Sequence, residues 1–242
     1  MIFKLLKKLV LIFAVPFVLI LSNCGPATQQ QNEDAEGVDD MAIEETPNMA
    51  DEVTIYRGEI QNMNFAQQEG QSIDGTVTIT VNDDIATVEV EAYSLPPNMM
   101  HLQHFHGFED GNEAECPEAE ADKNGDGIID LIETQESAGI TMIPLHDNPL
   151  NLEIKTETYP QAAENGDLKY STSFSVSEMQ NAVKEKYGLE NFDFNDFVLF
   201  IHSVNEGQNL PETVQSLPGV PAHITLPIAC AELEQVEGDE VL

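Results

Sequence analysis

The chain has 242 residues, of which 44 are Asp or Glu and only 9 are Lys or Arg, so its formal net charge is −35 at pH 7. So strong a negative field repels phosphate groups, which excludes nucleic acid and anionic lipid surfaces as natural partners. It favours divalent cations. The same charge also fits a well-hydrated surface in salt, without any dedicated cation site.

The first 23 residues are predicted to be an export signal. Three lysines precede an apolar run at residues 9–21, and its 13 residues fall short of the about 20 that a membrane span needs. The run ends in LSNCG, which resembles a bacterial lipobox, with Asn23 where Ala, Gly or Ser is usual. The resemblance implies cleavage before Cys24, lipid attachment to Cys24 and anchoring in a bacterial cell envelope, on its periplasmic or surface side. Simple secretion and an uncleaved anchor are the alternatives.

Behind the signal, composition divides the chain into three parts. Residues 24–51 are polar and acidic without an apolar period and are interpreted as a disordered tether, residues 52–236 as one folded domain, and residues 237–242 as an acidic tail. With Cys24 assigned to lipid, Cys116 and Cys230 are an even pair in an oxidising compartment, and we expect a disulfide between them. Closing so long a loop contributes about 3–5 kcal/mol.

The domain is predicted to be rich in β-strands. Residues 74–93 hold two alternating runs around Asn82-Asp83-Asp84, which indicates a hairpin with Ala86, Val88, Val90 and Ala92 on one face. Further strands are predicted at residues 53–64, 100–108, 152–158, 168–176, 197–204 and 223–232. One short helix is expected after Ser177, ending near Gly188. About eight short strands favour a sandwich or a barrel.

Residues 122–133, DKNGDGIIDLIE, match the twelve-residue calcium loop of the EF-hand family, and residues 115–139 are interpreted as an insertion that carries this loop. Carboxylate and amide oxygens alternate inward there, and Gly127 permits the sharp turn. The ligands are predicted to be Asp122, Asn124, Asp126, the carbonyl of Ile128, Asp130 and Glu133. The exit segment 128–139 is predicted to be a helix of about three turns. A lone loop in a β-rich domain favours a structural calcium site; a plain acidic surface loop is the alternative.

Three of the six histidines fall within residues 101–106. Because side chains alternate on a strand, His104 and His106 point to one face and His101 to the other. His202, in the apolar run FVLFIHSVN, is the candidate third ligand of a common metal, since a polar ring there needs a partner. Strand periodicity alone leaves open whether these rings are ligands or hydrogen-bonded structural residues; His101 and His223 are interpreted as structural.

The spacing His101-x-x-His104-x-His106 resembles the copper-binding segment of copper/zinc superoxide dismutases, and FVLFIHSVN and IACAEL resemble the family's later histidine and cysteine strands. Chordin-type (CHRD) domains resemble the first segment too. The resemblance implies a mainly β, Greek-key β-sandwich, copper or zinc on His104, His106 and His202, with His146 as a fourth candidate, and a bridge between Cys116 and Cys230.

Two departures weigh against dismutase activity. No histidine lies between His146 and His202, so the family's zinc cluster is expected to be absent, and Pro227 stands where the family has its guiding arginine. We therefore expect a calcium-binding, non-enzymatic surface or periplasmic domain with a second, histidine-based metal site. A copper-only dismutase-like enzyme and a copper- or zinc-storing module are the alternatives.

Overall fold

The computed structural model describes residues 53–64, 72–154 and 157–236. All of the described residues belong to one compact unit. The predicted signal, Cys24, the tether and the acidic tail lie outside the described residues. Within the described ranges, no helix has the length and apolar character that crossing a membrane requires.

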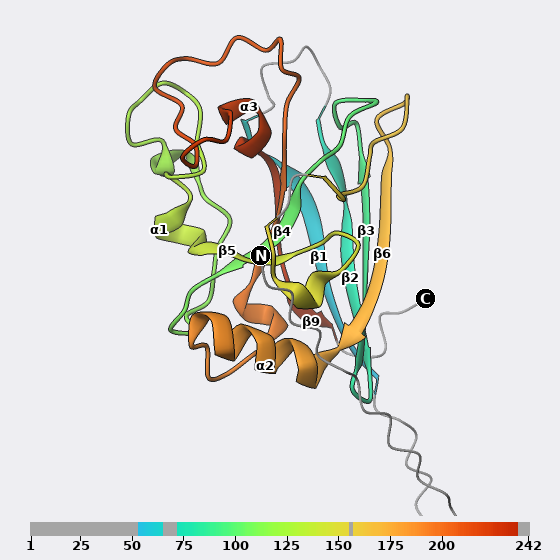
Figure 1. Cartoon of the computed structure of the whole chain (residues 1–242). Coiled ribbons are helices and arrows are strands. Elements are labelled where there is room, and N and C mark those ends of the chain that lie inside the picture. Colours follow the sequence, from blue (N-terminus) through green and yellow to red (C-terminus); the bar gives the residue numbers. More distant parts are fainter. Residues whose placement is uncertain (1–52, 65–71, 155–156, 237–242) are drawn as a thin grey trace, which may run out of the picture. The chain divides into compact units, whose positions relative to one another are not determined.

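The domain is mainly β, built on one curled antiparallel sheet (Figure 1). Its strands follow the order β5-β4-β7-β8-β1-β2-β3-β6, with β9 paired to β1. The connections from β3 to β4 and from β5 to β6 cross over so that β3 pairs with β6, which is a Greek-key arrangement. The predicted mainly β, Greek-key sandwich is therefore confirmed. The strands are β1 (Thr54–Asn62), β2 (Asp74–Asn82), β3 (Ile85–Tyr93), β4 (Gln103–Gly107), β5 (Ile140–Pro144), β6 (Leu168–Ser175), β7 (Val198–His202), β8 (Pro227–Glu232) and β9 (Glu234–Val236).

The inner face of the curled sheet forms the core. On β3 the predicted apolar face is fully buried, while Ile85 on the opposite face is exposed. Every residue of β7 is buried, which accounts for its nearly continuous apolar run. The helices are α1 (Gln135–Ala138), α2 (Val176–Tyr187) and α3 (Ala222–Thr225), with short 3-10 turns at Ala119–Ala121, Pro149–Asn151 and Phe194–Asp196.

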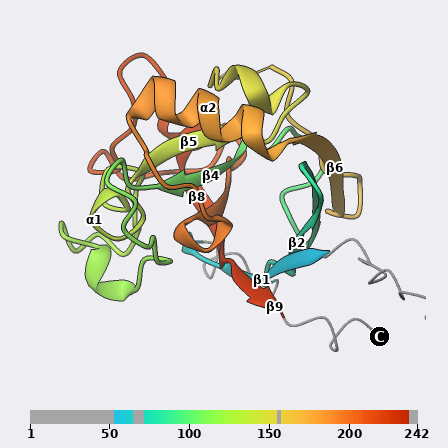
Figure 2. The same ribbon diagram turned by 90° about the horizontal axis from the view of Figure 1, so that it is seen from below.

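Helix α2 lies across one end of the sheet (Figure 2). It contacts both β5 and β6, the first and last strands in the sheet order, so it closes the curl between them. Met179 and Val183, four residues apart, bury one face of the helix against the core. The helix ends at Gly188, as predicted, and Gly188 has a φ of 80°. At the other end the N-cap residue is Ser175 and not Ser177: Ser175 Oγ accepts a hydrogen bond from Glu178 N at 3.1 Å.

The prediction was wrong in the segments around the inserted loop. The three-turn helix expected at residues 128–139 shrinks to the four residues of α1, and β5 follows directly. Gly139 permits this change of direction with φ 68°, and an added Cβ would lie 2.1 Å from the Gly107 carbonyl oxygen of β4. No strand forms in the described part of residues 152–158, and residues 222–225 form α3 instead of a strand.

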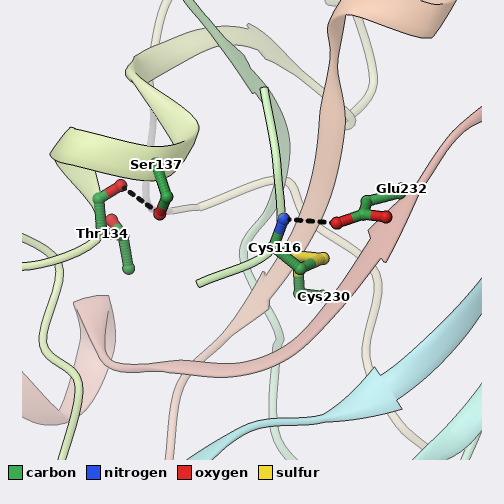
Figure 3. Close-up of a disulfide and its surroundings, with 5 residues drawn as sticks. All are labelled: Cys116, Thr134, Ser137, Cys230 and Glu232. Atoms are coloured by element: carbon green, nitrogen blue, oxygen red, sulfur yellow. Dashed lines mark hydrogen bonds between the residues drawn. A yellow bond between two sulfur atoms is a disulfide. The ribbon is translucent and has the colours of Figure 1, made fainter. Parts of the chain in front are cut away.

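The inserted segment is tied to the sheet at Cys116 (Figure 3). Cys116 and Cys230 of β8 form the predicted disulfide, with Cα atoms 5.9 Å apart. Cys116 N donates to the Glu232 carboxylate at 2.8 Å, and Ser137 Oγ donates to the Thr134 carbonyl at 3.3 Å. The disulfide joins two residues that lie 114 positions apart in the sequence.

Candidate metal centre

Two neighbouring strands bring three histidines together. Strands β4 and β7 pair antiparallel, with His104 opposite Phe200 and His106 opposite Val198, and His202 is the last residue of β7. The pairing register shifts next to His202 in the β7–β8 ladder and next to His106 in the β4–β5 ladder. At such register shifts the side chains change direction, so they no longer follow the regular alternation between the two faces of the sheet.

The three rings converge. His104, His106 and His202 each offer one ring nitrogen, and these nitrogens lie within 4.8 Å of one another. Across the described ranges of the chain, this is the one group of three or more His, Cys, Asp or Glu ligand atoms that meets so closely. Ring centroids are 5.2–6.1 Å apart, with the rings tilted against one another. The structure thus brings together the three histidines that the sequence selected.

The opposite nitrogen of each ring is held by a hydrogen bond. His104 Nε2 lies 2.7 Å from the Tyr159 hydroxyl, His106 Nε2 lies 2.9 Å from Thr141 Oγ1, and His202 Nδ1 lies 2.9 Å from the Thr225 carbonyl oxygen. The nitrogens without a partner are His104 Nδ1, His106 Nδ1 and His202 Nε2. One anchored and one unpartnered nitrogen per ring is the arrangement of metal-ligating histidines, whose outer bond fixes tautomer and orientation.

Burial keeps the rings neutral. His104, His106 and His202 are 3, 1 and 2 % exposed. Loss of solvation lowers the pKa of His104 and His106 well below the usual range, with His202 adding repulsion. Loss of solvation also lowers the pKa of His202 to about 4, although its bond to Thr225 acts in the other direction. A neutral imidazole keeps the lone pair that a metal needs.

The three nitrogens fit a transition-metal ion. A buried polar atom without a partner costs about 1–3 kcal/mol, so three of them facing one another need a physical reason. A metal ion bound by the three nitrogens would supply that reason. Imidazole nitrogens suit copper and zinc. The donor set therefore fits the metal that the resemblance implies.

The other candidate, His146, does not join the group. Its Nε2 lies 2.9 Å from the Glu153 carbonyl oxygen and its Nδ1 accepts from Asn148 N at 3.0 Å, so neither nitrogen has a free lone pair directed at the cluster. His101 likewise has both nitrogens against carbonyl oxygens, those of His202 and Pro96, each at 2.9 Å. His101 is not among the residues whose ring nitrogens converge.

The predicted calcium loop folds as a compact acidic turn. Its carboxylates mostly accept backbone N–H groups: Asp122 Oδ2 from Gly127 at 2.8 Å, and Glu133 Oε1 from Lys123 at 3.0 Å. Asp130 is fully buried, and its Oδ2 accepts from Gln215 N at 2.6 Å. The carboxylates among the predicted ligands do not form a convergent group like that of the histidines. Calcium binding stays a prediction.

Sequence reasoning missed the residues that hold the histidines. Thr141 lies on β5, which was not predicted; its register opposite His106 would have revealed it once that strand was known. Tyr159 comes from an irregular segment and Thr225 from α3, so no strand period connects either residue to the site. Their signal is chemical: each supplies a hydrogen-bonding oxygen to a buried ring.

No protein-family model matches this chain, and no curated protein matches it. Among solved structures, it is similar to two substituted variants of an SOD-like protein from Bacillus subtilis. Each is 17 % identical, with 73 % of this chain and 95 % of that chain covered and a TM-score of 0.37. At this score, the similarity supports no conclusion about what this chain binds.

Proposed function

We propose that the domain binds one copper or zinc ion on His104, His106 and His202. The observation that carries the proposal is the convergence of the three buried rings: one nitrogen of each lies within 4.8 Å of the others, and one nitrogen of each has no hydrogen-bond partner. Each ring is fixed by an outer hydrogen bond, so little conformational freedom remains to be lost on binding. When bound, the ion would satisfy all three nitrogens at once.

Metal content tests this proposal. After loading with copper or zinc and dialysis, the wild type is expected to retain one equivalent, whereas His104→Gln and His202→Gln retain far less. His146→Gln is the matched control, because His146 is equally buried but has both nitrogens engaged. Thermal unfolding verifies that each variant folds. Equal metal retention in His104→Gln and the wild type would remove the proposal.

We favour a function in which the domain binds the metal ion without catalysing a reaction. The three rings are at most 3 % exposed, Pro227 occupies the place of a guiding arginine, and the net charge of −35 repels an anionic substrate. The copper-loaded protein is therefore expected to show no superoxide turnover above that of the His202→Gln variant. Turnover that depends on His202 would favour the dismutase-like enzyme instead.

A calcium ion in loop 122–133 is a second proposal, and a structural role suits it. Every ligand position of the motif is filled, and the buried Asp130 links the loop to Gln215. A ligand that binds only the folded state stabilises it, so EGTA is expected to lower the Tm and calcium to restore it. An unchanged Tm together with a blank calorimetric calcium titration would contradict it.

Export and lipid anchoring at Cys24 complete the proposed setting. They are supported by the basic and apolar segments before the LSNCG sequence. Fatty-acid labelling of the expressed protein is expected for the wild type and lost in Cys24→Ala. Labelling that survives this change would contradict the anchor.

A further inference from the structure

A second site with different chemistry lies next to the three histidines. A pocket of about 340 Å³ is lined by two methionines, a histidine, three apolar residues and the polar residues Ser203, Asn205 and Glu206. The residues that matter here are Met99, Met100, Leu102, Val204, Glu206 and His223. Met99, Met100 and His223 are all partly exposed. Neither the calcium loop nor the three-histidine group includes any of them.

The pocket lies next to the histidine group, at the start of β4 and the end of β7. Leu102 lies two residues before His104, and Val204 lies two residues after His202. His202 N donates to the Leu102 carbonyl at 2.8 Å, and Val204 N donates to the His223 carbonyl at 2.8 Å. Ser203 Oγ also bonds the Ile224 carbonyl at 2.9 Å, which fixes α3 against this end of β7.

The lining suits a soft cation. Thioether sulfur is a weak ligand for hard ions such as calcium and magnesium, but it selects Cu(I), and imidazole accepts the same ion. Within the described residues, the His223 ring makes no hydrogen bond, in contrast to the five other histidines. His223 was interpreted as structural from the sequence, and its surroundings give it no such role.

We propose that Met99, Met100 and His223 form an entry site for Cu(I), from which the ion passes to His104, His106 and His202. The three rings are almost completely buried, so an ion needs a route to them, and the pocket lies beside the two strands that carry them. Transfer is ligand exchange: bonds to thioether sulfur and to His223 break, bonds to three imidazole nitrogens form, and copper stays Cu(I). The destination rests on the proposed function, but the entry site itself does not.

Anaerobic titration with Cu(I), supplied in competition with a chromophoric chelator, tests the site. In Met99→Leu/Met100→Leu, Cu(I) uptake is expected to slow at least tenfold, while the final copper content of the histidine group is unchanged. Met63→Leu is the control, since Met63 is also partly buried but lies outside the pocket. Zinc uptake should be unaffected, because zinc does not need the sulfur ligands. Equal Cu(I) uptake rates in wild type and double variant would overturn the entry site, and an equal slowing for zinc would overturn its soft-ligand chemistry.

The two proposals fail separately. In His202→Gln the histidine group is incomplete, so copper is expected to stop at the entry site and to show copper–sulfur scattering in X-ray absorption. That scattering should disappear when the two methionine substitutions are added. The entry site alone would be overturned if copper in the wild type were bound only by nitrogen and no copper–sulfur scattering were detected in His202→Gln. Sulfur scattering in a protein that never acquires three-imidazole copper would overturn the proposed function only.

Discussion

The outer hydrogen bonds decide which ring nitrogen each histidine offers. The Thr225 carbonyl can only accept, so His202 Nδ1 carries the proton and its Nε2 holds a lone pair. At His104 and His106 the partners are hydroxyl groups, which adapt to either tautomer. If His104 and His106 bind a metal through Nδ1, their proton must be on Nε2. The hydroxyl oxygens of Tyr159 and Thr141 can then accept a hydrogen bond from that N–H. The outer contacts and the convergence of the inner nitrogens are therefore mutually consistent.

Tyr159 is the outer contact most open to a test. Tyr159→Phe keeps the ring that packs on His104 at a centroid distance of 5.1 Å but removes the hydroxyl that fixes its Nε2. Loss of such a contact typically weakens metal binding 10–100-fold, which we expect for copper or zinc in competition titrations. Tyr170→Phe is the control, because that hydroxyl donates to the His146 carbonyl, outside the group. Equal affinity in Tyr159→Phe and Tyr170→Phe would show that Tyr159 does not position His104.

The ligands could be predicted from the sequence, but their supports could not. His104 and His106 share a strand with one residue between them, and period-two alternation is a local rule that needs no tertiary information. The contact from Tyr159 depends on where an irregular segment crosses the domain. His146 is outside the histidine group for a related reason. Its ring nitrogens bond to Glu153 and Asn148 in a local turn, and no sequence motif indicates these bonds.

At the scale of elements, a chain of hydrogen bonds connects the acidic loop with the histidine group. Asp130 Oδ2 accepts from Gln215 N at 2.6 Å, and the next residue, Ser216, bonds Thr225 Oγ1 at 2.7 Å. Thr225 in turn holds His202 Nδ1. Asn64 adds a parallel connection, because its amide bonds the carbonyls of Ile129 in the loop and Pro227 at the start of β8. The inserted loop thus supports the element that orients one of the three rings.

Replacing Asp130 tests that connection. Asp130→Ala leaves the backbone N–H groups of Ile132, Glu133 and Gln215 without their acceptor, which is expected to cost about 2–4 kcal/mol of folding free energy. In NMR spectra of the calcium-free protein, the His202 Nδ1–H proton should exchange faster with water. Asp110→Ala is the control, because Asp110 is exposed and bonds only to Asn112. Unchanged His202 exchange in a destabilised Asp130→Ala would mean that the loop is merely structural.

Local elements could be predicted and the segments around the insertion could not. The β2–β3 hairpin follows from alternation on both sides of one turn, which is information held within twenty residues. Strand β5 begins at Ile140, directly after the segment predicted to be a helix, and no strand was predicted there. What ends that helix is the close approach of Gly139 to Gly107, a contact between distant residues. The position of the helix cap also depends on a distant residue: Asp84 accepts from the Ser177 backbone N–H and from the hydroxyls of Ser175 and Ser177, while Ser175 Oγ accepts from Glu178 N.

For the whole molecule, closing the sheet around the histidines makes the domain sensitive to acid. Curling the sheet removes the three rings from water, and that lowers their pKa values in the folded state. In the unfolded chain a histidine titrates near pH 6.5. The unfolded chain therefore binds more protons than the folded domain once the pH falls below about 6.5. Stability is full above that value and declines as the pH falls toward the folded-state pKa values.

We expect the metal-free protein to lose folding stability between about pH 6.5 and 4. For His202, with a folded-state pKa of about 4, the loss is at most about 1.4 kcal/mol per pH unit, and His104 and His106 act in the same direction. Urea unfolding in EDTA at a series of pH values measures it. Carboxylates also titrate in the lower part of this pH range. The free energy of unfolding of the wild type is therefore compared at each pH with that of His202→Gln, whose side chain cannot be protonated. Because the carboxylates are common to both proteins, their contributions cancel, and the wild type should show the steeper decline. Parallel curves for the two proteins would mean that His202 is not held neutral in the folded domain.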